Sequence, residues 1–166
     1  MSAATRYRQL PSGARSIGFE LETPNGVELV AGEANVRVCE RRDGKPIGEL
    51  EVSVFQAALV IDRDGILEEK VQEAAGAAER GLRVAPAIPV SLPGASGYRA
   101  DADVVRPGVR PALPYVHVFA LAPHDLAADG GVVVTVRCAS PEWPAADAIL
   151  RSLRVLGRRG RTANDS

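Results

Sequence analysis

The sequence predicts an α+β domain with a curved, mainly antiparallel sheet and two helices packed on one side of it. Apolar residues alternate with polar ones over most of the chain, which is the pattern of half-buried strands. Short segments rich in Gly, Pro, Asn and Asp join these strands, and such connections favour antiparallel hairpins. Helical periodicity occurs in only two stretches, one in mid-chain and one near the C-terminus. Helices kept apart from runs of strands are typical of the α+β class.

The first third of the chain is expected to form strands. Residues 1–14 are polar and contain Gly and Pro, so we expect a flexible N-terminal arm there. A single domain then spans residues 15–157. Its first strand is predicted by Ile17, Phe19 and Leu21, which alternate with small or acidic residues. Further strands are expected over 27–31, 34–40 and 49–61.

In mid-chain the spacing of apolar residues changes from two to three and four, which predicts an amphipathic helix. Asp64 is the expected N-cap, and Gly81 lies where the helix should stop. Apolar residues recur at three- and four-residue spacing, which gives the helix one apolar face. These residues are Leu67, Val71, Ala74, Ala75, Ala78 and Leu82.

The last third of the chain predicts a hairpin followed by a closing helix. Residues 83–114 hold six prolines, so extended structure is expected there, with one strand over 98–104. The apolar runs 114–122 and 131–139 flank a polar connection and should pair as a hairpin. The closing helix is expected over 145–156, with Ser140 as N-cap and Pro141 at its first position. A basic and polar tail, 158–166, completes the chain.

Composition restricts the class of protein. A chain of 166 residues with 46% hydrophobic residues can bury a core without disulfides or metals. The net charge of −1 argues against a nucleic-acid binder with a basic surface. The basic residues are Arg except for Lys45 and Lys70, which indicates a GC-rich, bacterial genome. The N-terminus has no apolar signal segment and no apolar run could span a membrane, so a cytoplasmic location is expected.

The two cysteines are expected to stay reduced. Cys138 shares the parity of Val132, Val134 and Val136 and should point inward. Cys39 belongs to a different face of its strand, and a cytosolic setting disfavours a disulfide.

The order of elements resembles that of the PsbP-like superfamily, which includes PsbP, the Ran-binding Mog proteins, the DcrB-like proteins and the LpqN-type lipoproteins. The resemblance covers residues 15–156. It rests on 90–102 (VSLPGASGYRADA), on 115–121 (YVHVFAL), on 132–138 (VVVTVRC), and on Trp143 to Val155. Within the last segment, Ile149-Leu150-Arg151-Ser152-Leu153 matches an (I/L)-x-x-S-(I/L) pattern. The lipoprotein members carry an export signal and a lipidated cysteine, neither of which is expected for this chain. The resemblance implies protein binding, with no shared catalytic residues, and one DcrB-like branch acts as chaperones for secretion effectors.

No convergent catalytic set is predicted, and neither a cofactor nor a metal is expected. His124 and Asp125 lie in the hairpin connection, near Asp129 and after His117, and could hold a metal or act as a base. We favour the alternative of a solvated turn that Asp125 caps, because no Cys or Glu has ligand spacing to either histidine. No phosphate-binding glycine motif occurs.

Two surfaces are candidates for binding. The first is a sheet face that bears aromatic and Arg side chains, residue types that are common at protein interfaces: Tyr98, Arg99, Tyr115, His117 and Phe119. The alternative is that Tyr115 and Phe119 belong to the core. The second is a basic stripe for an anionic partner, with stabilisation of the helix C-terminus as the alternative. It consists of Arg151, Arg154, Arg158, Arg159 and Arg161.

The function expected from these observations is non-enzymatic. We expect a protein-binding adaptor or chaperone, such as an accessory protein of a bacterial secretion system, with another protein as its partner. A structural subunit that assembles into a homo-oligomer is a first alternative. A small-ligand-binding domain or minor enzyme, with a pocket between sheet and helix, is a second one.

Overall fold

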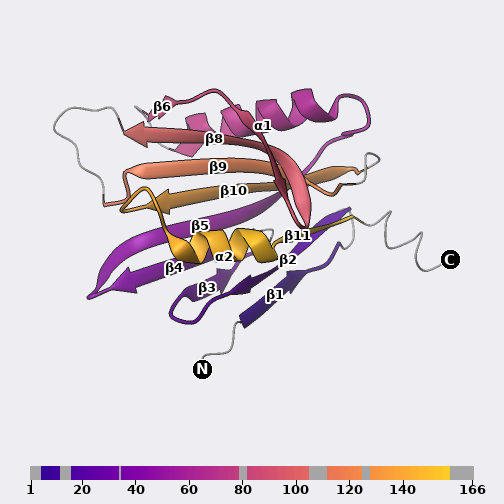
Figure 1. Cartoon of the computed structure of the whole chain (residues 1–166). Coiled ribbons are helices and arrows are strands. Elements are labelled where there is room, and N and C mark those ends of the chain that lie inside the picture. The colour runs from indigo at the N-terminus through magenta and orange to yellow at the C-terminus, as the bar shows by residue number, and fades with distance from the viewer. Residues whose placement is uncertain are drawn as a thin grey trace.

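A computed structural model describes residues 5–11, 16–33, 35–78, 82–104, 112–124 and 128–157. It contains two sheets and two helices (Figure 1). The strands are β1 (Thr5–Gln9), β2 (Ile17–Thr23), β3 (Glu28–Ala31), β4 (Asn35–Arg42), β5 (Lys45–Gln56), β6 (Leu82–Val84), β7 (Ile88–Leu92), β8 (Ala95–Val104), β9 (Tyr115–Ala122), β10 (Gly130–Cys138) and β11 (Arg154–Gly157). The helices are α1 (Arg63–Ala78) and α2 (Pro144–Ser152). The α+β class is therefore confirmed.

The large sheet has eight strands in the order β3-β4-β5-β10-β9-β8-β6, with β7 also paired to β8. Its strand pairs are all antiparallel, as the short connections predict. The predicted hairpin is present as β9 and β10, in which Val134 pairs with Phe119. The small sheet has the order β1-β2-β11 and is also antiparallel.

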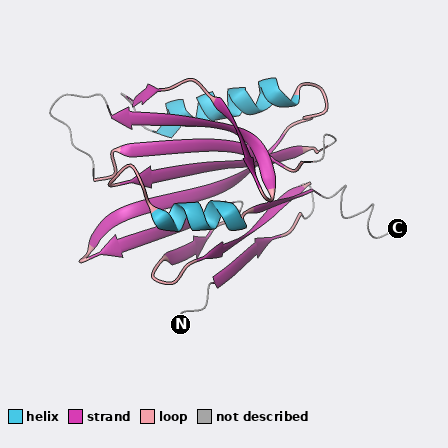
Figure 2. Ribbon diagram, viewed as in Figure 1, coloured by secondary structure: helices cyan, strands magenta, loops and turns pink. Residues whose placement is uncertain are grey.

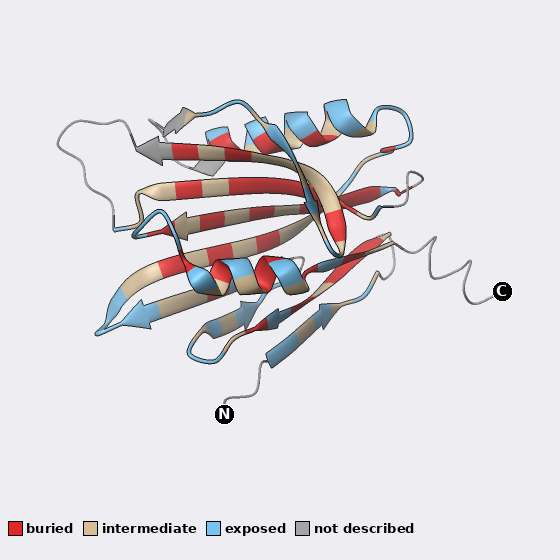
Figure 3. Ribbon diagram, viewed as in Figure 1, coloured by how far each residue is buried: buried red, intermediate tan, exposed pale blue. Residues whose placement is uncertain are grey.

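One face of the large sheet packs against α2 and the small sheet, and we call it the α2 face. Phe19 and Leu21 of β2, Val52 of β5 and Val134 of β10 are fully buried between these layers. Each such side chain contributes about 1.5–3 kcal/mol when it leaves water. This is the largest cluster of buried residues in the described part of the chain, and Figure 3 shows the buried positions alternating along its strands.

The opposite face, which we call the α1 face, packs against α1. Leu67 and Val71 of the helix are fully buried among small residues of β8 and β9, such as Ala100 and Ala120. The helix lies over β8, β9 and β10 and reaches Phe55 near the end of β5, where Lys70 Nζ lies 5.5 Å from the ring centre, but it leaves β4 and the rest of β5 uncovered on this face. The two helices therefore lie on opposite faces of the large sheet (Figure 2), and the expectation that both pack on one side is wrong. Sequence periodicity identifies an apolar helix face but says nothing about which sheet face it meets.

The start of α1 lies slightly earlier than predicted. The carboxylate of Asp62, not of Asp64, accepts the backbone N–H of Gly65 at 3.1 Å. Asp62 is therefore the capping residue, because an N-cap side chain bonds an N–H two or three residues later. Gly81, the expected stop, lies outside the described residues.

The closing helix begins after Pro141, its predicted first position, and ends before residue 156, its predicted end. It begins at Pro144 after Trp143, and the Ser140 hydroxyl instead donates to the backbone oxygen of Glu142 at 2.8 Å. It ends at Ser152, because Leu153 adopts extended backbone angles. The next residues form β11, which pairs with β2 and buries Val155 against the core.

Part of the expected N-terminal arm is ordered structure. Residues 5–9 form β1, and all five pair with β2. Few apolar side chains contribute to this strand, so the period-two pattern that identifies buried strands is weak there. The rest of the expected arm is described only at residues 10 and 11, and the tail 158–166 lies outside the described residues.

Candidate functional site

The α2 face of the large sheet is not covered uniformly. The small sheet and α2 cover part of this face, whereas β9, β8 and the edge strand β7 lie to one side of the helix (Figure 1). Strand register brings Ile88, Arg99 and Phe119 into one row across these three strands. The side chain of Ile88 is exposed and that of Phe119 is buried. Along this row the exposure of the side chains therefore falls from Ile88 at the sheet edge to Phe119 in the core.

A hydrogen-bonded network holds the polar side chains of this face. Arg99 donates to both carboxylate oxygens of Asp101, at 2.9 and 3.3 Å. His117 Nδ1 lies 2.8 Å from Asp101 Oδ1, and the carboxylate can only accept, so Nδ1 donates. The guanidinium carbon of Arg99 also lies 5.5 Å from the centre of the Phe119 ring. Arg99 is thus fixed in one orientation by a carboxylate and an aromatic ring.

This network lowers the pKa of Asp101. Partial burial raises the pKa of the carboxyl, but the hydrogen bonds and positive charge of Arg99 and His117 outweigh it, so the pKa lies below its ordinary value. Asp101 is therefore ionised at neutral pH. Its charge balances that of Arg99, which makes the network close to neutral when His117 is neutral.

Two hollows lie on either side of His117. The first, of about 230 Å³, is bounded by Arg99 and His117 on the sheet and by Trp143 and Asp147 from the segment that forms α2. The second, of about 450 Å³, lies towards the sheet edge and is bounded by Tyr115 and by the connection after β6. We call the first hollow, between α2 and strands β8 and β9, the α2 groove.

The α2 groove is lined by Cys138 and His117, and His117 bonds to Asp101 outside that lining; these are the residue types of a cysteine nucleophile, its base and an orienting carboxylate. The thiol is unsuited to this role. Cys138 is 1% exposed, and burial together with the negative charge of Asp147 raises its pKa to about 11. Only about one thiol in ten thousand is then ionised at neutral pH. The inward orientation predicted for Cys138 is confirmed, whereas Cys39 points to the α1 face.

The predicted binding surface is divided between two faces. The register places Arg99, Tyr115, His117 and Phe119 together on the α2 face. Tyr98 alternates with Arg99 along β8 and therefore lies on the α1 face, packed against the cluster beneath α1. Partial burial and the carboxylates of Asp64 and Glu68 raise its pKa.

Some residues of this site were missed by sequence reasoning. Asp101 has the same strand parity as Arg99, so the alternation over 98–104 could have identified it. Ile88 and Asp147 could not be assigned, because their places depend on how β7 and α2 lie against the sheet.

The predicted basic stripe does not lie on one helix. Arg151 is exposed on α2, but Arg154 belongs to β11, with its Nε 3.9 Å from a Glu20 oxygen. Glu20 also pairs with Arg8 at 3.2 Å. The stripe was predicted from a helix that continued to residue 156, and β11 replaces that part. Arg158, Arg159 and Arg161 lie outside the described residues.

The metal or base site considered at the hairpin connection lies only partly within the described residues. His124 and Asp129 are exposed, and Asp125 lies outside the described residues. His117 is on β9 and bonds to Asp101. Among the residues that the structure describes, no group of three or more His, Cys, Asp or Glu could hold a metal ion.

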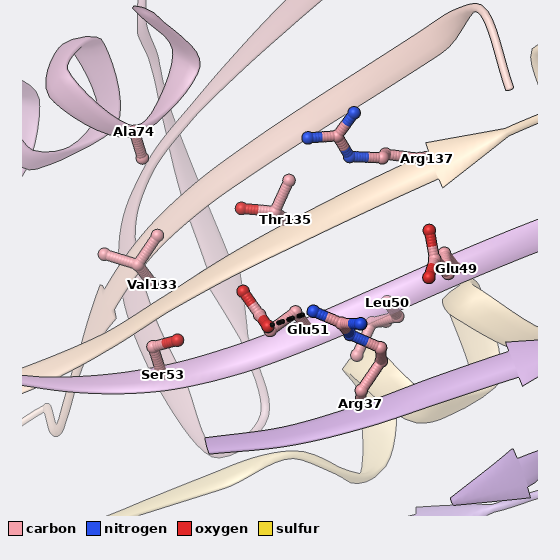
Figure 4. A pocket seen from close by; sticks show the side chains of 9 residues that line it. All are labelled: Arg37, Glu49, Leu50, Glu51, Ser53, Ala74, Val133, Thr135 and Arg137. Carbon is pink, nitrogen blue, oxygen red and sulfur yellow. Dashed lines mark hydrogen bonds and ion pairs between the residues drawn. The ribbon is translucent and has the colours of Figure 1, made fainter. Parts of the chain in front are cut away.

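Another groove, of about 400 Å³, lies on the α1 face, beside α1, where that helix leaves the sheet uncovered. Its walls are polar: Glu51 accepts from Arg37 and from Asn35, both at 3.2 Å, and Glu49 lies opposite Arg137. Figure 4 shows Arg37, Glu49, Glu51 and Arg137 on strands β4, β5 and β10, with Ala74 of α1 at the border. Cross-strand ion pairs of this kind stabilise a solvated sheet by about 0.2–1 kcal/mol each. We therefore interpret this groove as a solvated face.

Within the described ranges, neither helix is both long and apolar enough to cross a lipid bilayer. Comparison with models of known protein families and with curated proteins finds no match for this chain.

Proposed function

We propose that this chain is a non-enzymatic protein-binding adaptor or chaperone, and that its partner lies in the α2 groove and over the neighbouring strands β7 to β9. The main support is the row Ile88, Arg99 and Phe119, which combines an exposed apolar side chain, a fixed Arg and a buried ring. Arg and aromatic residues contribute most of the binding energy at many protein interfaces, especially where they are held in place before the partner arrives.

The resemblance to the PsbP-like superfamily agrees with this proposal. It suggests a role as an accessory protein of a bacterial secretion system. In this proposal the large sheet curves towards α2, so that a client segment meets the sheet and the helix at once. The inert thiol of Cys138 supports a role in binding over a role in nucleophilic catalysis.

Site-specific photo-crosslinking in the cell of origin tests this proposal. A benzophenone amino acid would replace Ile88, which is 54% exposed beside the groove, or Val30, which is 65% exposed on β3 at the far edge of the large sheet. Both are exposed aliphatic residues on short edge strands, so Val30 is a matched control. We expect one discrete heterologous adduct from position 88 and none from position 30.

Charge placed at the same positions gives a second readout. Ile88→Glu should abolish the adduct partner's binding to the purified protein, and Val30→Glu should leave it unchanged, while both variants keep the native circular dichroism spectrum. Equal adducts from both positions, or none from position 88, would contradict the proposal. An adduct between two copies of the chain would favour the self-assembling alternative.

The small-ligand alternative has its own support. The α2 groove holds Arg99 and His117 above an apolar floor, so polar side chains do converge between sheet and helix. A pocket of about 230 Å³ would admit a small metabolite. If position 88 yields no adduct, a thermal-shift screen of metabolites against wild type and Arg99→Ala becomes the decisive measurement for this alternative.

A further inference from the structure

The two walls of the α2 groove differ in charge. On the sheet wall, Arg99 and Asp101 neutralise each other. On the helix wall, Glu142 and Asp147 are both exposed and line the groove. Neither of these two carboxylates has a salt bridge or a side-chain hydrogen bond to another described residue. The helix wall therefore carries two carboxylates that have no ion-pair partner in the described part of the chain.

The negative charge acts on the interior of the groove. Asp147 lies in the first turn of α2, and its charge adds to the effect of burial on the Cys138 thiol at the floor. An acid in the first turn of a helix also stabilises that helix, so Asp147 alone has a structural explanation. Glu142 precedes the helix, and its carboxylate has no such explanation within the described residues.

The floor of the groove between these walls is apolar. Phe119, Val136 and Leu150 are at most 7% exposed, so an occupant would meet hydrocarbon and not hydrated groups there. An occupant that matches both the floor and the helix wall has an apolar group next to a positive charge. A negatively charged occupant would be repelled by Glu142 and Asp147, since Arg99 is already engaged by Asp101.

We infer that the α2 groove binds a cationic, apolar segment of the partner, in which a Leu-like side chain lies on the floor and an adjacent Lys or Arg faces Glu142 and Asp147. This inference rests on the proposed function and specifies the chemistry of the partner at the same site. The basic residue would lie near the start of α2, and the rest of the segment would run towards Ile88.

Three fluorescein-labelled peptides of equal length test the inference, with alternating Leu-Lys, Leu-Glu or Leu-Ser sequences. Fluorescence polarisation would measure their binding to the purified full-length protein. We expect the Leu-Lys peptide to bind at least tenfold more tightly than the other two. Its affinity should fall as salt is raised, because exposed charges are screened.

Two double variants separate a local effect from one of net charge. Glu142→Gln with Asp147→Asn removes the carboxylates of the helix wall and should weaken the Leu-Lys peptide about fivefold to tenfold. Glu28→Gln with Glu69→Gln removes two exposed carboxylates from β3 and α1 and should leave binding unchanged. Equal weakening by both pairs would overturn the inference. So would equal binding of all three peptides, or no binding of the Leu-Lys peptide at about 1 mM.

The photo-crosslinked partner distinguishes this failure from failure of the proposed function. If position 88 captures a partner that binds the Glu142→Gln, Asp147→Asn variant with wild-type affinity, the groove binds protein but the cationic segment is wrong. If position 88 captures nothing, the proposed function itself fails.

Discussion

Gly48 and Trp143 form a contact whose energy can be measured directly. Gly48 lies on β5, on the α2 face, and the indole ring of Trp143 covers it. A methyl group at position 48 would overlap the six-membered part of that ring. Trp143 is only 4% exposed, and its Nε1 donates to Glu40 at 2.8 Å, so the ring cannot move without losing contacts. We therefore expect Gly48→Ala to displace the indole.

The loss of folding free energy caused by Gly48→Ala follows from these contacts. Overpacking a buried site costs about 1–3 kcal/mol. Losing a hydrogen bond to a charged acceptor costs about 1.5–3 kcal/mol. A Trp truncated to Ala costs about 3–5 kcal/mol, which sets an upper limit for losing the ring contacts altogether. We expect Gly48→Ala to destabilise the protein by about 3 kcal/mol and to lower Tm by about 6–12 °C.

A double-mutant cycle tests the physical reason. In a Trp143→Ala background the overlap is absent, and Gly48→Ala should be neutral or stabilising by about 0.5 kcal/mol, because alanine restricts the unfolded chain. The assay is urea unfolding followed by far-UV circular dichroism, since the chain's one tryptophan is removed in this background. Equal destabilisation by Gly48→Ala in both backgrounds would refute the reasoning, because the cost would then have another source.

Three further outcomes are expected. Gly97→Ala should destabilise the protein by more than about 2 kcal/mol, because the added Cβ would overlap the backbone oxygen of Ala120. Gly76→Ala on α1 places its Cβ in open space and should stabilise the protein by about 0.5–1 kcal/mol. Urea unfolding measures both free-energy changes. The lowered pKa of Asp101 means that its ionised form stabilises the fold above its ordinary pKa of 3.8, and this contribution is lost as the pH falls through the lower folded value. The stability deficit of Asp101→Asn at pH 7 should therefore shrink in acid; a deficit independent of pH would contradict this. With a pKa raised to about 11, the Cys138 thiol should react with Ellman's reagent at pH 8 only after unfolding, and fast labelling of the native Cys39→Ser variant would show that the thiol is accessible.

Features encoded by local pattern could be predicted from the sequence. The β9–β10 hairpin and the mid-chain helix follow from periods of two and of three to four residues, and both are present. The end of the closing helix could not be predicted in the same way. Leu153 and Leu156 fit a helical repeat with Ile149, but Leu153 is extended and the residues after it pair with β2. That choice depends on a strand far away in the sequence, which no local period reveals.

The alternation of side chains along a single strand could predict only part of the candidate site. Arg99, Tyr115, His117 and Phe119 share a face, but Tyr98 was grouped with Arg99 although neighbours in a strand point to opposite faces. The helix wall with Glu142 and Asp147 arises from the packing of α2 against the sheet. Packing of that kind depends on tertiary geometry and leaves no periodic signal in the sequence.

The pairing of β11 with β2 has a consequence for how the chain is made. Val155 pairs with Phe19, and the hydroxyl of Ser152 accepts the backbone N–H of Glu22 at 2.8 Å, so β11 and the residue before Leu153 complete the environment of β2. A ribosome would have to synthesise a further 130 residues after Glu22 before Ser152 and the strand that follows it became available to β2. Until then β2 would have β1 on one edge only, and contacts so distant in sequence form slowly. The newly made protein would pass through a stage in which an apolar strand edge is open to other chains.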